Sequence, residues 1–171
     1  PAAVELPPPV CLVVVHRLGA AETLVGGAPG STLLLPSAAV APQQARIHFS
    51  GGRYAIDDLA GGATQVSYGG DPAQLRPIQR NALREGSLVQ LGSLRFVFHQ
   101  TAEGASLERR IAVPANGLSI GTDPACDVVI AAAAPQRARI SAQGKHWLVE
   151  RLTGECQVSF GGSLEQLRPL A

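Results

Sequence analysis

The sequence predicts an all-β fold in which one β-sandwich module occurs twice. The first observation is a repeat: residues 41–47 (APQQARI) return as 134–140 (APQRARI), and residues 65–70 (QVSYGG) return as 157–162 (QVSFGG). The offsets of 93 and 92 residues indicate a duplicated domain, because solenoid units have roughly 20–50 residues. The second observation is that short β-branched or alternating runs lie between glycine- and proline-rich turns, which is typical of a β-sandwich.

The elements of the first copy follow one another as short strands. Strands are expected where β-branched residues cluster or where polar and apolar residues alternate over a few positions. Glycine and proline between these runs predict the turns. Short helical segments are expected only around Pro72–Leu75 and Gln79–Leu83. The expected strands are residues 10–15, 32–35, 46–49, 54–56, 65–68, 87–91 and 95–99.

The repeat also predicts the domain boundaries. The proline-rich residues 1–9 are expected to form an extended leader. Residues 10–100 are expected to form the first domain, 101–106 a linker and 107–171 the second domain. In the core, Tyr54 and Trp147 hold equivalent places, and we expect each to pack in its sandwich beside the leucine that follows it. These leucines are Leu59 and Leu152.

The second copy has no counterpart of residues 81–99, which supply the last strands of the first copy. We therefore expect the second sandwich to be truncated at its C-terminus as it stands. An open sheet edge recruits a strand, either from a longer chain or from a neighbouring molecule. Exchange of strands between two chains would give a homodimer, with the segment around residues 10–15 as a candidate donor.

Composition excludes several classes of function. Charged residues make up 16% of the chain and its formal net charge is +1, so no strong field favours nucleic acid or anionic lipid as the main partner. The longest apolar runs, residues 10–15 and 128–135, are far shorter than the roughly 20 residues that span a bilayer. No membrane insertion of this chain is expected.

The residues that carry catalysis or bind metals do not form a recognisable pattern. The four histidines have no ligand spacing, no nucleophile lies near a base in sequence, and no Cys-x-x-Cys occurs, so we expect neither an enzyme, a metal site nor a cofactor. The three cysteines do not match between the copies and predict a reducing, cytoplasmic compartment rather than disulfides. The histidines are His16, His48, His99 and His146, and the cysteines are Cys11, Cys126 and Cys156.

Residues 118–130 (LSIGTDPACDVVI) carry a family resemblance. They resemble the signature of forkhead-associated (FHA) domains, which is Ile-Gly-Arg, a short polar loop, then Asp and three apolar residues. Residues 24–35 hold the same place in the first copy. Residues 54–59 (YAIDDL) resemble the aromatic strand that ends in Asp-Leu-Gly, and residues 83–92 (LREGSLVQLG) resemble the family's closing strand. The resemblance implies two tandem FHA-like sandwiches.

FHA domains usually bind phosphothreonine peptides on loops at one end of the sandwich, and this chain departs from their binding residues. The arginine for the phosphate is replaced by Gly27 and Thr122, and the serine beside it by Ala41 and Ala134. The supporting histidine is replaced by Gln44 and Arg137, and the asparagine that holds the peptide by Gln65 and Gln157. Losing the arginine and serine removes ~3–6 kcal/mol of charge-assisted hydrogen bonding, or roughly 10²–10⁴ in affinity.

These observations predict a phospho-independent protein–protein interaction module. It is expected to be the regulatory or scaffolding part of a larger bacterial protein, in the cytoplasm or on the cytosolic side of a membrane-anchored parent. One alternative is an unconventional phosphothreonine reader that uses Arg137, since arginine pairs with phosphate through two nitrogens. Another is an anion or nucleic-acid binder that uses the scattered arginines, such as Arg76, Arg80 and Arg84.

Overall fold

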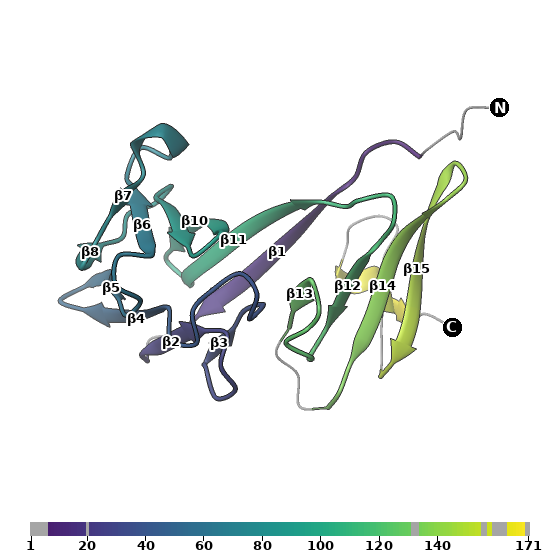
Figure 1. The fold of residues 1–171 in the computed structure, drawn as a ribbon, viewed down its shortest axis with the longest axis horizontal. Helices are drawn as coiled ribbons and strands as arrows, with labels where there is room; N and C mark the ends of the chain where they lie inside the picture. Colours follow the sequence, from purple (N-terminus) through teal and green to yellow (C-terminus); the bar gives the residue numbers. More distant parts are fainter. Residues whose placement is uncertain (1–6, 20, 131–133, 155–156, 159–163, 170–171) are drawn as a thin grey trace. The chain divides into compact units, whose positions relative to one another are not determined.

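The computed structural model describes residues 7–19, 21–130, 134–154, 157–158 and 164–169, and it is all-β (Figure 1). The chain divides into two compact units. The first unit is Leu12–Ile111, and the second consists of Ala112–Ala171 together with Pro1–Cys11. The only helical elements among the described residues are two single 3-10 turns, and none of them could cross a membrane.

The first unit is a sandwich of two sheets. One sheet has five strands in the order β3-β2-β4-β5-β8, and the other has six in the order β1-β11-β10-β9-β6-β7. β2 and β3 are parallel, whereas β2, β4, β5 and β8 pair antiparallel in that order. The strands of the five-stranded sheet are β2 (Thr23–Gly26), β3 (Leu33–Leu34), β4 (Ala45–Ser50), β5 (Arg53–Asp58) and β8 (Arg80–Ala82). Those of the six-stranded sheet are β1 (Cys11–Leu18), β6 (Thr64–Ser67), β7 (Arg76–Pro77), β9 (Leu88–Leu91), β10 (Leu94–Thr101) and β11 (Gly104–Ala112).

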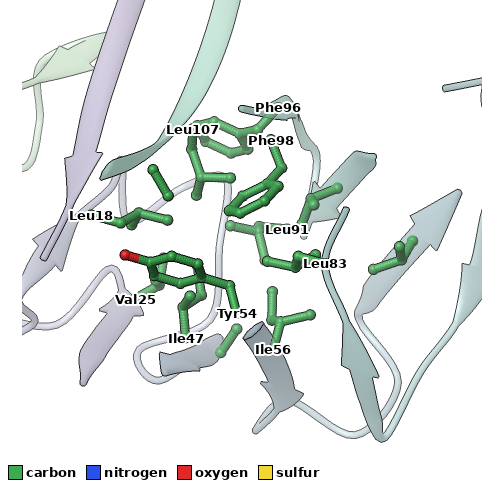
Figure 2. Packing of buried hydrophobic residues seen from close by; sticks show 14 of the residues in the cluster. Leu18, Val25, Ile47, Tyr54, Ile56, Leu83, Leu91, Phe96, Phe98 and Leu107 are labelled. Carbon is green, nitrogen blue, oxygen red and sulfur yellow. The ribbon is translucent and has the colours of Figure 1, made fainter. Parts of the chain in front are cut away.

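Alternation along the strands puts one face of each sheet into a shared core. In β10, Phe96 and Phe98 are buried, whereas Arg95 is exposed and Val97 is half-buried, as the two-residue period of a strand requires. Figure 2 shows these rings, with Leu107 of β11, facing side chains of the other sheet. Those side chains include Val25, Ile47, Tyr54 and Ile56, and Leu18 from β1 and Leu83 and Leu91 complete the labelled cluster.

The second unit contains a four-stranded sheet in the order β13-β12-β14-β15 and a two-stranded sheet of β16 and β17. Its strand order repeats that of the first unit, because β12 pairs parallel with β13 and antiparallel with β14, as β2 does with β3 and β4. The 3-10 turns before β7 and β17 also correspond. The elements are β12 (Leu118–Gly121), β13 (Val128–Val129), β14 (Arg137–Gln143), β15 (His146–Thr153), β16 (Gln157–Val158), η2 (Leu164–Gln166) and β17 (Arg168–Pro169).

Two expected local structures differ from those observed. The segment 79–83 is not helical, because Arg80–Ala82 is strand β8 and pairs with Ala55–Asp57 of β5. Residues 101–106 are not a linker but the turn of the β10–β11 hairpin and the start of β11, so the first unit extends to Ile111. The expected helical turn at 72–75 is observed as η1 (Pro72–Gln74), where the Asp71 carboxylate accepts a hydrogen bond from the Ala73 N–H.

The expected core positions are also corrected in part. Tyr54 is buried in the first core, but Leu59 is 42% exposed and lies outside it. In the second unit Leu152 is 54% exposed. Trp147 is half-buried, and its indole Nε1–H donates to the Pro8 carbonyl at 2.8 Å. Tyr54 packs against Phe98 of β10 in the facing sheet, and no ring contact of that kind is found for Trp147 among the described residues.

Candidate functional site

Three loops of the first unit, residues 27–32, 35–44 and 59–63, connect β2 to β3, β3 to β4 and β5 to β6. The first two are joined by backbone hydrogen bonds, since the Gly27 N–H donates to the Ala41 carbonyl at 3.0 Å and the Ala28 N–H to the Pro42 carbonyl at 3.2 Å. The Gly92–Ser93 turn joins the third loop to the second through the Ala63 and Ala39 carbonyls. The loops therefore support one another through main-chain contacts.

Gly27 has no room for a side chain. The residue is buried, and a Cβ built on it would lie 2.8 Å from the Cα of Ser37. This is a backbone atom, so relief would require a shift of the β3–β4 loop rather than of a flexible side chain. Its neighbour Gly26 is packed even more closely, with the Pro42 carbonyl oxygen 2.1 Å from such a Cβ. Gly26 and Gly27 therefore allow the β3–β4 loop to pack directly against the end of β2.

Gln44 is fully buried and holds the β3–β4 loop. Its Oε1 accepts a hydrogen bond from the Ala41 N–H at 3.0 Å, and its Nε2 donates to the Thr64 hydroxyl at 3.1 Å. The Thr64 hydroxyl donates in turn to the Gln44 carbonyl at 3.3 Å. Because a buried amide is costly unless both ends are paired, this side chain fixes the loop to strand β6.

Replacing Gln44 by leucine is expected to lower the free energy of unfolding of the first unit by about 1–3 kcal/mol, because the half-buried Ala41 N–H loses its acceptor and the buried Thr64 hydroxyl loses a donor. Urea unfolding followed by circular dichroism measures this. The matched control is Gln43→Leu at the exposed neighbouring position, where the change should stay within about 0.5 kcal/mol. Equal effects at the two positions would contradict a buttressing role for Gln44.

The loops carry no charged residue, and the nearest charge is negative. Residues 27–32, 35–44 and 59–63 contain no Lys, Arg, His, Asp or Glu. Asp58, the last residue of β5, lines an open groove of about 670 Å³ together with Leu59 and Ile78, and no cation lines it. Burial opposes ionisation of Asp58, but hydrogen bonds, above all from the Gly62 N–H, outweigh it and lower the pKa of the carboxyl. The groove beside the third loop therefore has one acidic and no basic residue in its lining.

The fourth expected position, Gln65, does not join the others. It lies in β6 between the buried Thr64 and Val66, so it belongs to the opposite face of the strand and is half-buried. The structure brings Gly27, Ala41 and Gln44 into one hydrogen-bonded set and leaves Gln65 outside it. The residue that completes the set is Thr64, a buried polar side chain that the sequence analysis did not single out.

The corresponding positions of the second unit are less closely joined. Thr122 makes two hydrogen bonds with the backbone of Gln136. Its N–H donates to the Gln136 carbonyl at 3.0 Å, and its hydroxyl accepts from the Gln136 N–H at 3.2 Å. Ala134 is exposed. Arg137 is exposed and lines a pocket of about 280 Å³ with Asp127. Gln157 lies in β16 opposite Pro169.

Another polar cluster, which the sequence analysis missed, lies on the five-stranded sheet. Asp57 is 5% exposed and accepts hydrogen bonds from Arg80 at 2.5 Å and from Arg46 at 2.8 Å. The two arginines come from β8 and β4, on either side of Asp57 in β5. The Arg80 guanidinium, with that of Arg46, lowers the pKa of Asp57 from 3.8 to about 2 despite the opposing effect of burial. The cluster ties three strands together.

Arg76, Arg80 and Arg84, the scattered arginines of the anion-binder alternative, are each held by a contact within the first unit. Arg80 pairs with Asp57, Arg76 donates to the Ala73 and Leu75 carbonyls, and Arg84 stacks on the Tyr68 ring at 4.8 Å. Within the described part of the chain, no three His, Cys, Asp or Glu side chains are grouped to hold a metal ion. Cys126 is buried, Cys11 is exposed, and Cys156 lies outside the described residues.

No model of a protein family matches the chain, and no curated protein matches it. Similar solved structures include the FHA domain of FhaA in complex with the intracellular domain of Rv3910, at 16% identity and a TM-score of 0.40 over 60% of this chain and 100% of that one. The FHA-2 domain of the Mycobacterium tuberculosis ABC transporter Rv1747 has 18% identity and a TM-score of 0.40 over 54% and 78%. The FHA domain of CT664 from Chlamydia trachomatis has 16% identity and a TM-score of 0.38, over 58% of this chain and 95% of that one. At these values nothing about the chemistry of this chain follows from the likeness.

Proposed function

We propose that this chain is a non-catalytic protein–protein interaction module, made of two FHA-like sandwiches, that binds its partner independently of phosphorylation. The sequence motifs at 118–130, 54–59 and 83–92 support the FHA-like assignment, together with the shared strand order of the two units. The observation that carries the phospho-independence is the absence of any charged residue from the three loops of the first unit.

A phosphate dianion needs cationic or well-aimed N–H donors in place of its water shell. At these loops the Gly27 and Ala41 N–H groups already donate to the Ala41 carbonyl and to Gln44. Placing an arginine at position 27 would displace the β3–β4 loop. What remains exposed is a neutral surface of small residues and hydroxyls, such as Ser37 and Ser93, which suits a neutral segment of a partner protein.

The setting we propose is the cytosolic, regulatory or scaffolding part of a larger bacterial protein. Cys126 supports a reducing compartment, because it is a buried thiol outside any disulfide. Neither catalysis nor a cofactor is part of the proposal.

The test compares phosphothreonine peptides with their unphosphorylated counterparts by calorimetry on the whole chain. We expect affinities that differ by less than about threefold, since the three loops of the first unit contain no cationic residue. Micromolar binding that disappears on dephosphorylation would overturn the proposal. In that case Arg137→Gln, compared with the equally exposed Arg151→Gln, would show whether the second unit is the reader.

The second unit supports one further arrangement, a homodimer formed by strand exchange. Among the described residues no strand pairs with the outer edge of β15, which exposes backbone donors and acceptors. We expect sedimentation velocity to show a dimer whose fraction rises with protein concentration. A proline in place of Val149 in β15 should reduce dimerisation by removing an N–H group. A concentration-independent monomer would exclude the exchange.

A further inference from the structure

The first unit has a second groove where both sheets end, and it adjoins the groove at the third loop through Pro77, Ile78 and Gln79. β7 is the last strand of the six-stranded sheet and β8 is the last strand of the five-stranded sheet (Figure 1). The chain passes from one to the other through Ile78, and a groove of about 470 Å³ is lined by residues of β6, β7 and β8. Grooves at sheet edges accept extended peptides, since the edge strands leave backbone groups unpaired.

The groove is positively charged. Its charged lining residues are Arg76 and Arg80, and neither Asp nor Glu lines it. Tyr68, which also lines it, is 41% exposed and carries the Arg84 guanidinium 4.8 Å from its ring centre. Arg84 does not line the groove itself but is in contact with Tyr68, which does. Asp57 offsets one of the three arginines, since its carboxylate is bonded to Arg80.

The arginines are held in place by the protein itself. Both hydrogen bonds of Arg76, to the Ala73 carbonyl at 3.3 Å and to the Leu75 carbonyl at 2.8 Å, are made by Nη1. Arg80 is fixed by Asp57 and Arg84 by Tyr68. Cations that are already ordered lose less side-chain entropy when they bind a carboxylate.

One buried polar group at the groove has no partner. Ser67 lines the groove and is 3% exposed, and its hydroxyl makes no hydrogen bond within the described part of the chain. Native proteins pair nearly all buried hydroxyls, so a lone one calls for a ligand, water or ion.

We propose that this groove binds an extended acidic segment of a partner protein. Arg76 and Arg84 pair with carboxylates of that segment, and the segment lies along the edges of β7 and β8. The inference rests on the proposed function in one respect, that the ligand is a protein. Arg76 and Arg84 lie outside the three uncharged loops, so the two proposals are tested by separate variants.

The test uses fluorescence anisotropy of a short labelled peptide of alternating glutamate and serine, titrated with the whole chain at low ionic strength. Its matched probe has glutamine in place of each glutamate. We expect the acidic peptide to bind at least roughly tenfold more tightly than the glutamine peptide, and Arg76→Gln combined with Arg84→Gln to remove roughly tenfold of that affinity. Arg80 is left intact because it holds Asp57. The control is Arg95→Gln, on the exposed side of β10 and bonded to Gln90, which should bind as the parent does.

Three outcomes would overturn the proposal. Equal binding of the two peptides, or no saturable binding of the acidic one, would mean that the groove does not select carboxylates. An equal loss in the Arg95→Gln control would indicate attraction by the whole surface. Displacement of the peptide by inorganic phosphate at constant ionic strength would assign the groove to small anions instead. A phosphorylation-dependent reader at the loops would leave these results unchanged, so the failure of either proposal is recognised separately.

Discussion

Replacing Tyr54 by alanine is expected to lower the free energy of unfolding of the first unit by about 3–5 kcal/mol, as for other buried aromatic residues. Tyr54 is 7% exposed, and its ring centre lies 5.7 Å from that of Phe98 and 4.9 Å from that of Phe49. Removing the ring leaves a cavity between the two sheets. Urea unfolding followed by circular dichroism and hydrogen exchange of the first unit's amides measures the loss.

Trp147 supplies the matched comparison, because the repeat puts it at the position of Tyr54. Trp147→Ala is expected to cost the second unit only about 1–2 kcal/mol, since the side chain is half-buried and loses one hydrogen bond, to the Pro8 carbonyl. As the sole tryptophan, it also reports on the second unit by fluorescence. Equal losses at both positions would show that Trp147 is as buried as Tyr54.

The difference between these two residues shows what the repeat can predict. Backbone pairing was predictable, because the strand order of β12–β15 repeats that of β2–β5. The burial of Tyr54 and Trp147 was not predictable from the repeat, because it depends on strands that are distant in sequence. Tyr54 is covered by Phe98 of β10, and β8 lies beside β5. Strand β8 itself was mistaken for a helix, because three residues carry little periodicity and their conformation is set by pairing with β5.

The family resemblance singled out Gly27, Ala41 and Gln44 as positions of a ligand-binding loop, and that role stays a prediction. The structure shows that the three residues are joined by local hydrogen bonds. The resemblance did not locate Thr64, which meets Gln44 across 20 residues of sequence. Nor did it locate the Asp57 cluster, whose bond to Arg80 spans 23 residues. Contacts of this kind depend on sheet register, which a single sequence does not specify.

Asp57 is expected to make the first unit sensitive to acid. Its carboxylate is bonded to Arg80 and Arg46, and His48 lies 3.7 Å away. The Arg80 guanidinium is the main reason that its pKa falls from 3.8 to about 2 on folding. Because the folded chain binds this proton less readily than the unfolded one, the stabilisation is fully present above about pH 4 and is lost as the pH falls from there to about 2.

The size of this effect follows from the shift and from the exposure of the partners. Lowering the pKa of Asp57 from 3.8 to about 2 corresponds to somewhat more than 2 kcal/mol of stability. The Arg46 and Arg80 side chains are 38% and 67% exposed, so solvent screens both ion pairs and reduces this value. We therefore expect Asp57 to contribute about 1–2 kcal/mol at neutral pH. Asp58 and Glu85, whose pKa values are also lowered, keep part of the acid dependence when Asp57 is replaced.

The measurement is urea unfolding of the parent and of Asp57→Asn at a series of pH values from neutral to about 2. The parent should lose stability relative to Asp57→Asn through the window from about pH 4 to pH 2, so that the two curves converge in acid. Glu103→Gln, at the exposed turn between β10 and β11, is the control and should run parallel to the parent throughout. A constant gap between the parent and Asp57→Asn at every pH would contradict the assignment. It would mean that Asp57 stabilises the sheet by packing and neutral hydrogen bonds rather than by its charge between the two arginines.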